Sequence, residues 1–283
     1  TILKFNKIKM FEKSKYLNKI CWSFDKSSNP YPLILIDNFL KIEIYKEIAE
    51  KFPSLKIFKN NGDIEGNNTQ IRIGFSDFSQ KLDLCWKELG SHFLNEDFFY
   101  NFCEFFKDDI KYWYPKVYSR LKNKNLKIGI QGIDNFDDCD VLLDFQVGIN
   151  TPVKKVTSVR GPHLDNQKSL YTALCYLKDN DDITDSGHFT AYKLKPFRLI
   201  SLGSSRSVNL SDVSNYKEIK YKSNRLATFL NTKKSIHGVT QRELTDKVRK
   251  FFAFNAVFKE QLYKMSFLSR VTNRVKIFFD KKK

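Results

Sequence analysis

Histidine is rare in this sequence, with four among 283 residues, so each histidine needs a structural or chemical reason. No run of about eighteen apolar residues occurs, which predicts that no helix spans a membrane. The N-terminal stretch also lacks the uninterrupted apolar core of a signal peptide. The five cysteines are an odd number, and none forms a CxxC pair. These absences predict a reducing compartment with free thiols, and we expect a cytoplasmic protein.

Acidic residues are outnumbered, since 49 Lys and Arg against 32 Asp and Glu give a net charge of 49 − 32 = +17. A chain this basic favours anionic partners such as nucleic acid, a membrane surface or an acidic glycan. Glycine and proline are scarce while Lys, Asn, Ile and Phe are abundant, and AT-rich coding produces the same bias without any partner. The charge leaves both interpretations open. The hydrophobic content of 41%, with 15% aromatic residues, excludes a disordered chain.

The first part of the chain reads as helical support for a later β-rich core. Residues 1–29 form a basic N-terminal arm. In the region 30–125, the run PYPLILIDNFL predicts a buried strand, and apolar residues at helical spacing follow in 41–53. Residues 80–122 again show helical spacing. The polar, turn-forming stretch 55–70 predicts a long loop suited to cover a substrate.

Between residues 126 and 258 the pattern changes to short β-rich runs separated by turn residues. The expected strands are 141–149, 154–161, 169–177, 188–194, 197–203, 207–210, 218–223, 225–231 and 250–258. Many short strands at regular spacing predict an antiparallel sandwich or barrel. The tail 259–283 mixes apolar and basic residues and predicts an amphipathic helix, which either packs on the barrel or makes peripheral contact with a membrane. We expect one mainly β, α+β unit without a linker between independent domains.

One histidine stands two residues before an aspartate, in the triplet His163-Leu164-Asp165. On an extended segment, residues i and i+2 point the same way, so this pair presents an imidazole nitrogen and a carboxylate oxygen side by side. A third ligand from a distant strand is needed, and His237 follows an apolar strand and a polar turn. Two histidines and one carboxylate form the facial triad of non-haem Fe(II) oxygenases, which keeps coordination positions open.

An arginine opens the last β-rich run, RKFFAFNAVF, at Arg249. A guanidinium is always charged and can hold a carboxylate through two hydrogen bonds. Arg242, in the polar turn after His237, is the alternative anchor. We prefer Arg249 because a strand holds it in place.

These residues lie within a stretch, about 141–258, that resembles the prolyl-4-hydroxylase-type branch of the Fe(II)- and 2-oxoglutarate-dependent oxygenases. The matching pieces, in the family's order, are HLD, the strand YTALCYL with Tyr176, SGHFTAYK, RLATFLNTKKSIHGV and the arginine-led RKFFAFNAV. The N-terminal strand and helix are similar to the lead-in of that family. The resemblance implies a double-stranded β-helix (jelly roll) packed against N-terminal helices.

The resemblance also implies the cofactors and a role for each residue. His163, Asp165 and His237 would hold Fe(II). Arg249 would pair with the distal carboxylate of 2-oxoglutarate, and the Tyr176 hydroxyl would join it. With O₂ as co-substrate and ascorbate as an optional reductant, such an enzyme hydroxylates an unactivated C–H bond and releases succinate and CO₂. Since Asp165 occupies the position that a halogenase vacates for chloride, hydroxylation is favoured.

The prime substrate is less defined. The resemblance implies a peptidyl, amino-acid, glycan or other small-molecule substrate, and Gln146 and Arg160 either line its pocket or lie on ordinary strand surface. A nucleic acid is not favoured, because Asn255 stands near the place where nucleic-acid-modifying members usually carry a second arginine. His188, directly after Ser186-Gly187, either touches the site or packs nearby.

Other classes of function remain open. The same fold hosts cupin-like metal-dependent isomerases and non-enzymatic binding modules, and neither needs a carboxylate anchor such as Arg249. A basic nucleic-acid-binding protein without metal is a third class, although no recognised binding motif is present.

Overall fold

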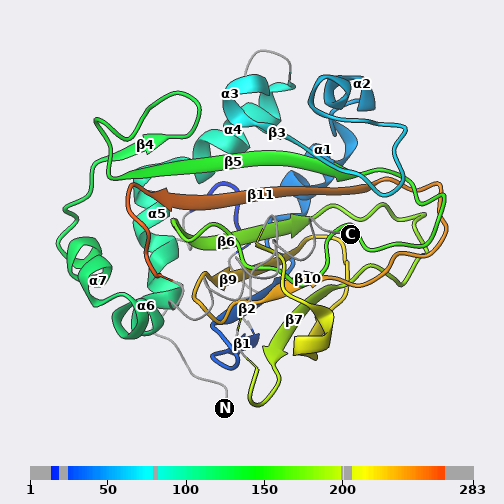
Figure 1. Ribbon diagram of the computed structural model, residues 1–283. Coiled ribbons are helices and arrows are strands. Elements are labelled where there is room, and N and C mark those ends of the chain that lie inside the picture. The colour runs from blue at the N-terminus through cyan, green and yellow to red at the C-terminus, as the bar shows by residue number, and fades with distance from the viewer. Residues whose placement is uncertain (1–13, 19–24, 79–81, 199, 201–205, 265–283) are drawn as a thin grey trace.

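The computed structural model describes residues 14–18, 25–78, 82–198, 200 and 206–264 (Figure 1). The helices are α1 (Ile42–Glu50), α2 (Leu55–Phe58), α3 (Phe75–Phe78), α4 (Leu84–Phe93), α5 (Glu96–Cys103), α6 (Lys107–Trp113) and α7 (Pro115–Lys122). The strands are β1 (Asp25–Ser27), β2 (Leu33–Asp37), β3 (Gln70–Gly74), β4 (Ile128–Ile130), β5 (Val141–Asn150), β6 (Ser169–Tyr176), β7 (Phe189–Leu194), β8 (Val213–Ile219), β9 (Arg225–Leu230), β10 (His237–Val239) and β11 (Arg249–Phe258). The helices precede most of the strands, as the sequence predicts for a mainly β, α+β fold.

Within these described residues, the strands form two sheets. The large sheet has eight strands in the order β1-β2-β9-β6-β11-β5-β3, with β4 paired to β5, and the small sheet has the order β10-β7-β8. Neighbouring strands pair antiparallel, except for β4 with β5. The chain passes repeatedly between the sheets, because β6 lies in the large sheet, β7 and β8 in the small one, β9 in the large one and β10 in the small one. Segments distant in sequence are thereby brought together.

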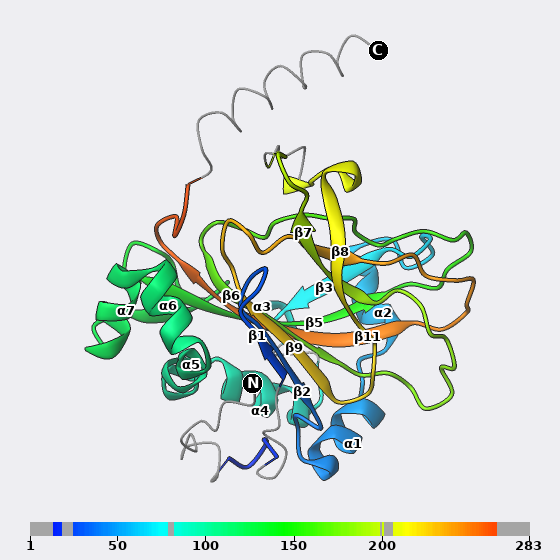
Figure 2. The same ribbon diagram turned by 90° about the horizontal axis from the view of Figure 1, so that it is seen from below.

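Side-chain alternation along the strands of the large sheet creates two apolar layers. On β11, Phe252 and Phe254 pack in the core shared with the helices, whereas Phe251 and Ala253 pack in the core shared with the small sheet. Figure 2 shows β7 and β8 on one side of the large sheet and α1, α4 and α5 on the other. Each fully buried Phe contributes roughly 2–3 kcal/mol to this packing. The large sheet is therefore the middle layer of three.

The helical layer is held by caps and aromatic packing. The Asn95 side chain accepts hydrogen bonds from the backbone of Asp97 and Phe98, which begins α5. The rings of Phe98 and Phe102 then pack on Phe254 of β11, with centroids 5.6 and 5.1 Å apart. This layer covers one face of the sheet, and the small sheet lies on the other face.

The expected strand 154–161 is wrong, because this segment is an irregular loop. Its backbone bonds are spread over several partners. Lys154 and Lys155 donate to the side chain of Asn67, and Thr157 makes an isolated bridge to Arg242. A continuous ladder needs a single neighbouring strand, and none runs beside this loop among the described residues.

Two other expected strands also need correction, and a third is largely untested. The segment 207–210 forms only an isolated bridge at Ser207, and the expected strand 218–223 is the end of β8, which stops at Ile219. Most of 197–203 lies outside the described residues. The short strand β3 was not expected, since its five residues follow a run of turn formers.

The stretch 55–70 is not a plain loop. It contains α2 and a 3-10 turn, and Phe58 is buried in the core beside the helices. The arm 1–29 includes β1, which pairs with β2. The expected C-terminal helix falls mainly on residues 265–283, outside the described residues. No helix in the part described is long and apolar enough to cross a membrane.

Candidate metal centre

The two histidines of the expected triad face each other across a pair of backbone hydrogen bonds. His163 N donates to His237 O at 2.8 Å, and His237 N donates to His163 O at 3.0 Å. Their ring centroids are 4.2 Å apart. The small sheet therefore extends from β10 to the segment that carries His163, and this pairing brings residues distant in sequence to one place.

Asp165 completes the cluster two residues after His163. Its Oδ1 atom lies 3.6 Å from His163 Nε2 and 3.5 Å from His237 Nε2. One ligand atom from each of the three residues lies within 4.8 Å of the others. Both histidines are buried, whereas the Asp165 side chain is 18% exposed. The cluster thus has two nitrogens and one oxygen at metal-binding spacing, with its accessible side at the carboxylate.

The hydrogen bonds fix the tautomers of both histidines. His163 Nδ1 lies 2.9 Å from Gly161 O, and His237 Nδ1 lies 2.9 Å from Ser235 O. A carbonyl oxygen only accepts, so each Nδ1 must carry the proton. In a neutral ring the lone pair is then on Nε2, the atom that faces Asp165. Such outer contacts orient histidine ligands in metal sites.

The protonation states of His163 and Asp165 also suit a metal. Burial lowers the pKa of His163 to about 4, and the nearby imidazole of His237 acts in the same direction. Burial opposes ionisation of Asp165, but the electrostatic interaction with His237 and the contacts with both imidazoles outweigh it and hold the Asp165 pKa well below its usual range. At neutral pH, His163 is neutral and Asp165 ionised, which is the state a divalent cation requires.

A threonine orients the carboxylate. Thr172 Oγ1 of β6 donates to Asp165 Oδ2 at 2.7 Å, and Asn231 Nδ2 donates to Thr172 Oγ1 at 3.0 Å. The contact leaves Oδ1 directed at the two histidines. Thr172 and Asn231 were not expected from the sequence, although alternation along β6 places Thr172 on the same face as the expected Tyr176.

Aromatic rings wall the histidine side of the cluster. Phe229 of β9 packs on the His237 ring at 4.5 Å between centroids, and Phe189 of β7 stacks on it at 5.5 Å. Both phenylalanines are buried. This wall limits water at the nitrogen ligands and keeps the imidazole in place.

Arg249, the expected anchor, is buried without a carboxylate partner among the described residues. It is 5% exposed, its guanidinium lies over the Tyr221 ring at 4.0 Å, and its nitrogens donate to the carbonyls of Gly187 and Ser186. Its Nε atom has no hydrogen-bond partner in the described part of the chain. Burying an unpaired cation is costly, so this environment fits a carboxylate from a ligand.

The alternative anchor, Arg242, is held by hydrogen bonds within the protein. Its NH1 donates to Asn68 Oδ1 at 2.8 Å and Thr151 O at 3.0 Å, and its NH2 donates to Lys247 O at 3.1 Å. Arg242 therefore joins three loops. Gly187 separates it from Arg249: this residue has φ +66, and a Cβ there would lie 2.2 Å from Arg242 Cγ.

Tyr176 lies near Arg249, on the inner face of β6. Its ring meets the Tyr221 ring edge-on, with centroids 5.3 Å apart, and Tyr221 in turn stacks on the Arg249 guanidinium. Burial raises the pKa of Tyr176 to about 12, with Arg249 acting against the shift. The phenol is therefore neutral and able to donate a hydrogen bond beside the arginine.

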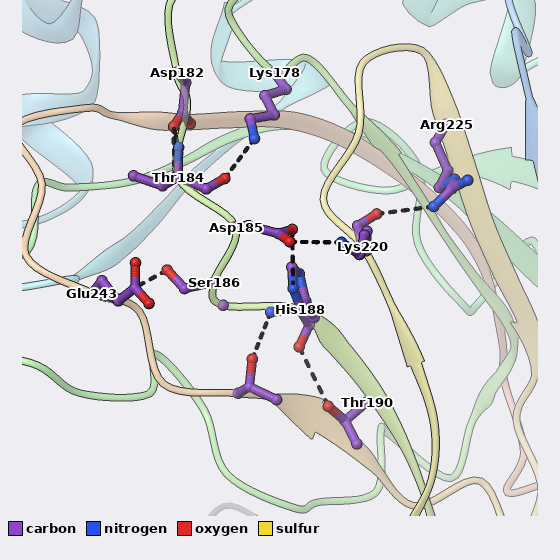
Figure 3. Close-up of polar contacts among 12 residues, drawn as sticks. Lys178, Asp182, Thr184, Asp185, Ser186, His188, Thr190, Lys220, Arg225 and Glu243 are labelled. Carbon is purple, nitrogen blue, oxygen red and sulfur yellow. Dashed lines mark hydrogen bonds and ion pairs between the residues drawn. The ribbon is translucent and has the colours of Figure 1, made fainter.

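His188 does not join the metal centre. Figure 3 shows its ring beside Asp185, which also binds Lys220, and its Nε2 lies 3.4 Å from Asp185 Oδ1. Its backbone N donates to Thr240 Oγ1 at 2.7 Å. The next residue, Phe189, points into the inner core, and strand alternation turns His188 the other way.

No protein-family model matches this sequence, and the comparison with curated proteins found no match. Among solved structures, the fold is similar to a prolyl 4-hydroxylase from Phytophthora capsici, with 14% identity, coverage of 85% of this chain and 68% of that chain, and a TM-score of 0.44. A prolyl-4-hydroxylase from Pseudomonas putida is 9% identical, with coverage of 81% of this chain and 93% of that chain and a TM-score of 0.42.

A third similar structure is HygX from Streptomyces hygroscopicus with nickel, 2-oxoglutarate and hygromycin B bound, at 12% identity, 80% and 83% coverage and a TM-score of 0.42. The prolyl 4-hydroxylases among these structures belong to the branch that the sequence motifs resemble. At this level of similarity the resemblance does not determine the reaction or the substrate of this chain.

Proposed function

We propose that this protein is an Fe(II)- and 2-oxoglutarate-dependent oxygenase that hydroxylates an unactivated C–H bond. The observation that carries the proposal combines two features: the cluster of His163, Asp165 and His237, and the buried Arg249, which has no carboxylate partner among the described residues. The cluster fits a divalent metal, and the arginine fits the far end of a dicarboxylate.

The strand order supports the corresponding fold. The strands β5, β11, β6 and β9 are adjacent in the large sheet, while β10, β7 and β8 form the small one. The bridge between His163 and His237 adds the segment before β6 to the small sheet. We interpret this arrangement as a double-stranded β-helix. In it, the segment at His163 takes the place of a strand of the small sheet but pairs with β10 through a single bridge.

Each named side chain would have a defined task. His163 and His237 offer Nε2 while Nδ1 is held by a backbone carbonyl, and Asp165 offers Oδ1 while Thr172 holds Oδ2. Bound at these atoms, Fe(II) with 2-oxoglutarate and O₂ supplies the oxidising chemistry, in which R–H becomes R–OH and succinate and CO₂ are released.

The remaining residues would position the co-substrate and exclude water. Arg249 would receive the distal carboxylate of 2-oxoglutarate, replacing an uncompensated buried charge by an ion pair. Tyr176 would donate its hydroxyl to the same carboxylate. Phe189 and Phe229 would keep solvent from the nitrogen ligands.

The experiment that tests this proposal measures binding and turnover of 2-oxoglutarate. Metal-free protein is titrated calorimetrically with 2-oxoglutarate, with and without Mn(II) as a non-oxidising substitute for Fe(II). We expect measurable binding only with metal, and its loss in His163→Ala and in Arg249→Met. Arg120→Met, on exposed α7, removes the same charge far from the cluster and should bind normally.

Turnover is then followed in air as succinate released from 2-oxoglutarate in the presence of Fe(II) and ascorbate. Slow release without a prime substrate, absent in the two site variants, is the expected result. Metal binding without any response to 2-oxoglutarate would identify a cupin-like metal protein instead. Failure to bind any divalent metal would overturn the proposal entirely.

A further inference from the structure

A polar strip crosses the large sheet on the face that looks toward the small sheet. Cross-strand register places Thr172 on β6, Asn255 on β11 and Asp144 on β5 side by side. Asn255 Nδ2 donates to Asp144 Oδ2 at 3.1 Å. Because Thr172 also bonds the proposed metal ligand Asp165, the strip begins at the metal centre and leads away from it.

Arg72 forms the far end of this strip. It lies on the edge strand β3, and its NH1 donates to Gln146 Oε1 at 3.1 Å. Gln146 Nε2 in turn donates to Asp144 Oδ2 at 2.7 Å. The guanidinium lies 5.2 Å from the centroid of the Phe251 ring. A neutral amide and an aromatic ring therefore hold this cation in a fixed orientation, with hydrogen-bond donors to spare.

Glycine makes this stacking possible. Gly148 is the residue of β5 that pairs with both Arg72 and Phe251. A Cβ at Gly148 would lie 2.3 Å from Phe251 Cζ, a distance that atoms do not tolerate. The phenylalanine ring therefore reaches across β5 only because glycine stands there, and Arg72 rests on it.

In the part of the chain that the structure describes, no carboxylate lies within ion-pair distance of Arg72. Its side chain contacts Gln146 and Phe251 instead. Burial lowers the pKa of Arg72, and the more distant charges of Asp165 and Asp144 only partly oppose this effect. Burial also raises the pKa of Asp144, which weakens that carboxylate as a counter-ion. Such a cation favours an anion from outside.

Two more arginines stand around the metal centre. The backbone oxygen of Arg160 accepts from Val239 N at 2.9 Å, beside the strand of His237. Arg206 Nε donates to Leu164 O at 3.2 Å, at the residue between the two ligands of the triplet. Arg160 and Arg72 both interact with the charge of Asp165. These cations come in addition to Arg249, which has its own proposed partner.

We infer that Arg72 binds an anionic group, a carboxylate or a phosphate, on the prime substrate. The inference rests on the proposed function, because it places that group on the polar strip that begins at a metal held by the triad. Fe(II) and Arg249 would balance Asp165 and 2-oxoglutarate, so Arg72, which has no carboxylate within ion-pair distance among the described residues, leaves a positive charge that an anionic substrate neutralises. The planar donor edge of a guanidinium suits both anions.

The test uses the full chain loaded with Mn(II) and saturated with 2-oxoglutarate. Two probes are measured separately: inorganic phosphate by phosphorus NMR relaxation, and acetate labelled at its carboxyl carbon by carbon NMR relaxation. Mn(II) accelerates the relaxation of a nucleus only when it binds close by, so anions elsewhere on this basic surface contribute little. Zn(II)-loaded protein gives the diamagnetic background, and the stronger of the two responses identifies the substituent.

Variants separate the inference from its alternatives. We expect Arg72→Met to reduce the metal-dependent relaxation about tenfold, the usual effect of losing a hydrogen bond to a charged group. Arg72→Lys should retain part of it, since the charge remains. Arg120→Met on α7 should leave it unchanged. The electron paramagnetic resonance signal of Mn(II) reports in each variant whether the metal itself is still bound.

The outcomes distinguish two failures. If Mn(II) does not bind, the proposed function fails before the anion is considered. If Mn(II) binds but the probes relax equally in wild type and Arg72→Met, the anion sits on the metal or elsewhere, and the inference about Arg72 is overturned. Loss of the response in Arg72→Met with Mn(II) still bound supports it.

Discussion

Thr172 Oγ1 donates a hydrogen bond of 2.7 Å to Asp165 Oδ2. This bond connects β6 of the large sheet to the proposed metal ligand. The bond engages one carboxylate oxygen and leaves the other beside both histidines. A ligand held in this way loses little freedom when a metal binds. The metal affinity of the cluster should depend on a residue that does not touch the metal.

Thr172→Val removes this hydrogen bond while keeping the shape of the side chain. We expect Mn(II) affinity to fall by about 10- to 100-fold, the range found when outer partners of metal ligands are lost. Thr172→Ser keeps the hydroxyl and is the matched control. Titration of both variants with Mn(II), followed by electron paramagnetic resonance, measures these affinities. Equal Mn(II) affinities in wild type and Thr172→Val would show that Thr172 is only a packing residue.

The same substitution should change the free energy of unfolding by different amounts at two buried arginines. Arg242→Met leaves acceptors on Asn68, Thr151 and Lys247 unsatisfied, and we expect the free energy of unfolding to fall by about 3 kcal/mol. Arg249→Met frees the carbonyls of Gly187 and Ser186 but also removes a buried cation that has no carboxylate partner among the described residues, so we expect these effects to offset each other to within about 1 kcal/mol. Denaturant unfolding of both ligand-free variants tests this, and a large loss in Arg249→Met would mean that the arginine is structural.

The same pair predicts a difference in ligand response. Wild-type protein and Arg242→Met should both gain thermal stability when Mn(II) and 2-oxoglutarate are added, because both keep Arg249. Arg249→Met should gain stability from Mn(II) but nothing further from 2-oxoglutarate. Thermal unfolding curves with each addition provide the measurement. A 2-oxoglutarate shift in Arg249→Met would place the carboxylate elsewhere.

Gly187 should tolerate no side chain. It has φ +66, and a Cβ would lie 2.2 Å from Arg242 Cγ and 3.2 Å from Arg249 NH1. We expect Gly187→Ala to cost about 2 kcal/mol of unfolding free energy through backbone strain and this contact. It should also weaken 2-oxoglutarate binding by displacing Arg249. Gly161→Ala, where a Cβ would meet nothing within 4 Å, is the control.

His92 should make the fold sensitive to acid. Burial among aromatic rings on α4 lowers the pKa of His92 from 6.5 to about 4. The unfolded chain therefore binds a proton that the folded chain does not, over the range between these values. Stability from this group is complete above pH 6.5 and is lost as pH falls toward 4, by about 3 kcal/mol at most. His92→Phe should flatten the pH dependence of unfolding over this range, and an unchanged slope would refute the assignment.

The sequence predicted those parts of the fold that local patterns determine. Alternating or continuous apolar runs located β5, β6, β9 and β11 within one or two residues, and helical spacing located the helices between 84 and 122. The H-x-D triplet predicted a side-by-side histidine and aspartate because extended backbone alone brings residues i and i+2 to one side. These features need no knowledge of distant neighbours.

Features set by long-range pairing could not be predicted in the same way. Arg72 reaches the inner face only because β3 pairs with β5, and nothing local in the stretch before it signals that partner. The segment 154–161 has residues typical of a strand, but no neighbouring strand is there to pair with it among the described residues. The role of Thr172 depends on how the turn after Asp165 returns to β6, which alternation along β6 alone does not reveal.

The most direct test of the central claim is an anaerobic titration of metal-free protein with Fe(II) and then 2-oxoglutarate, followed by visible absorbance. We predict a weak charge-transfer band that requires both additions, survives in Arg120→Met and disappears in His163→Ala and Arg249→Met. Fe(II) binding without any band on addition of 2-oxoglutarate would contradict the assignment of Arg249. A band that persists in His163→Ala would contradict the metal centre itself.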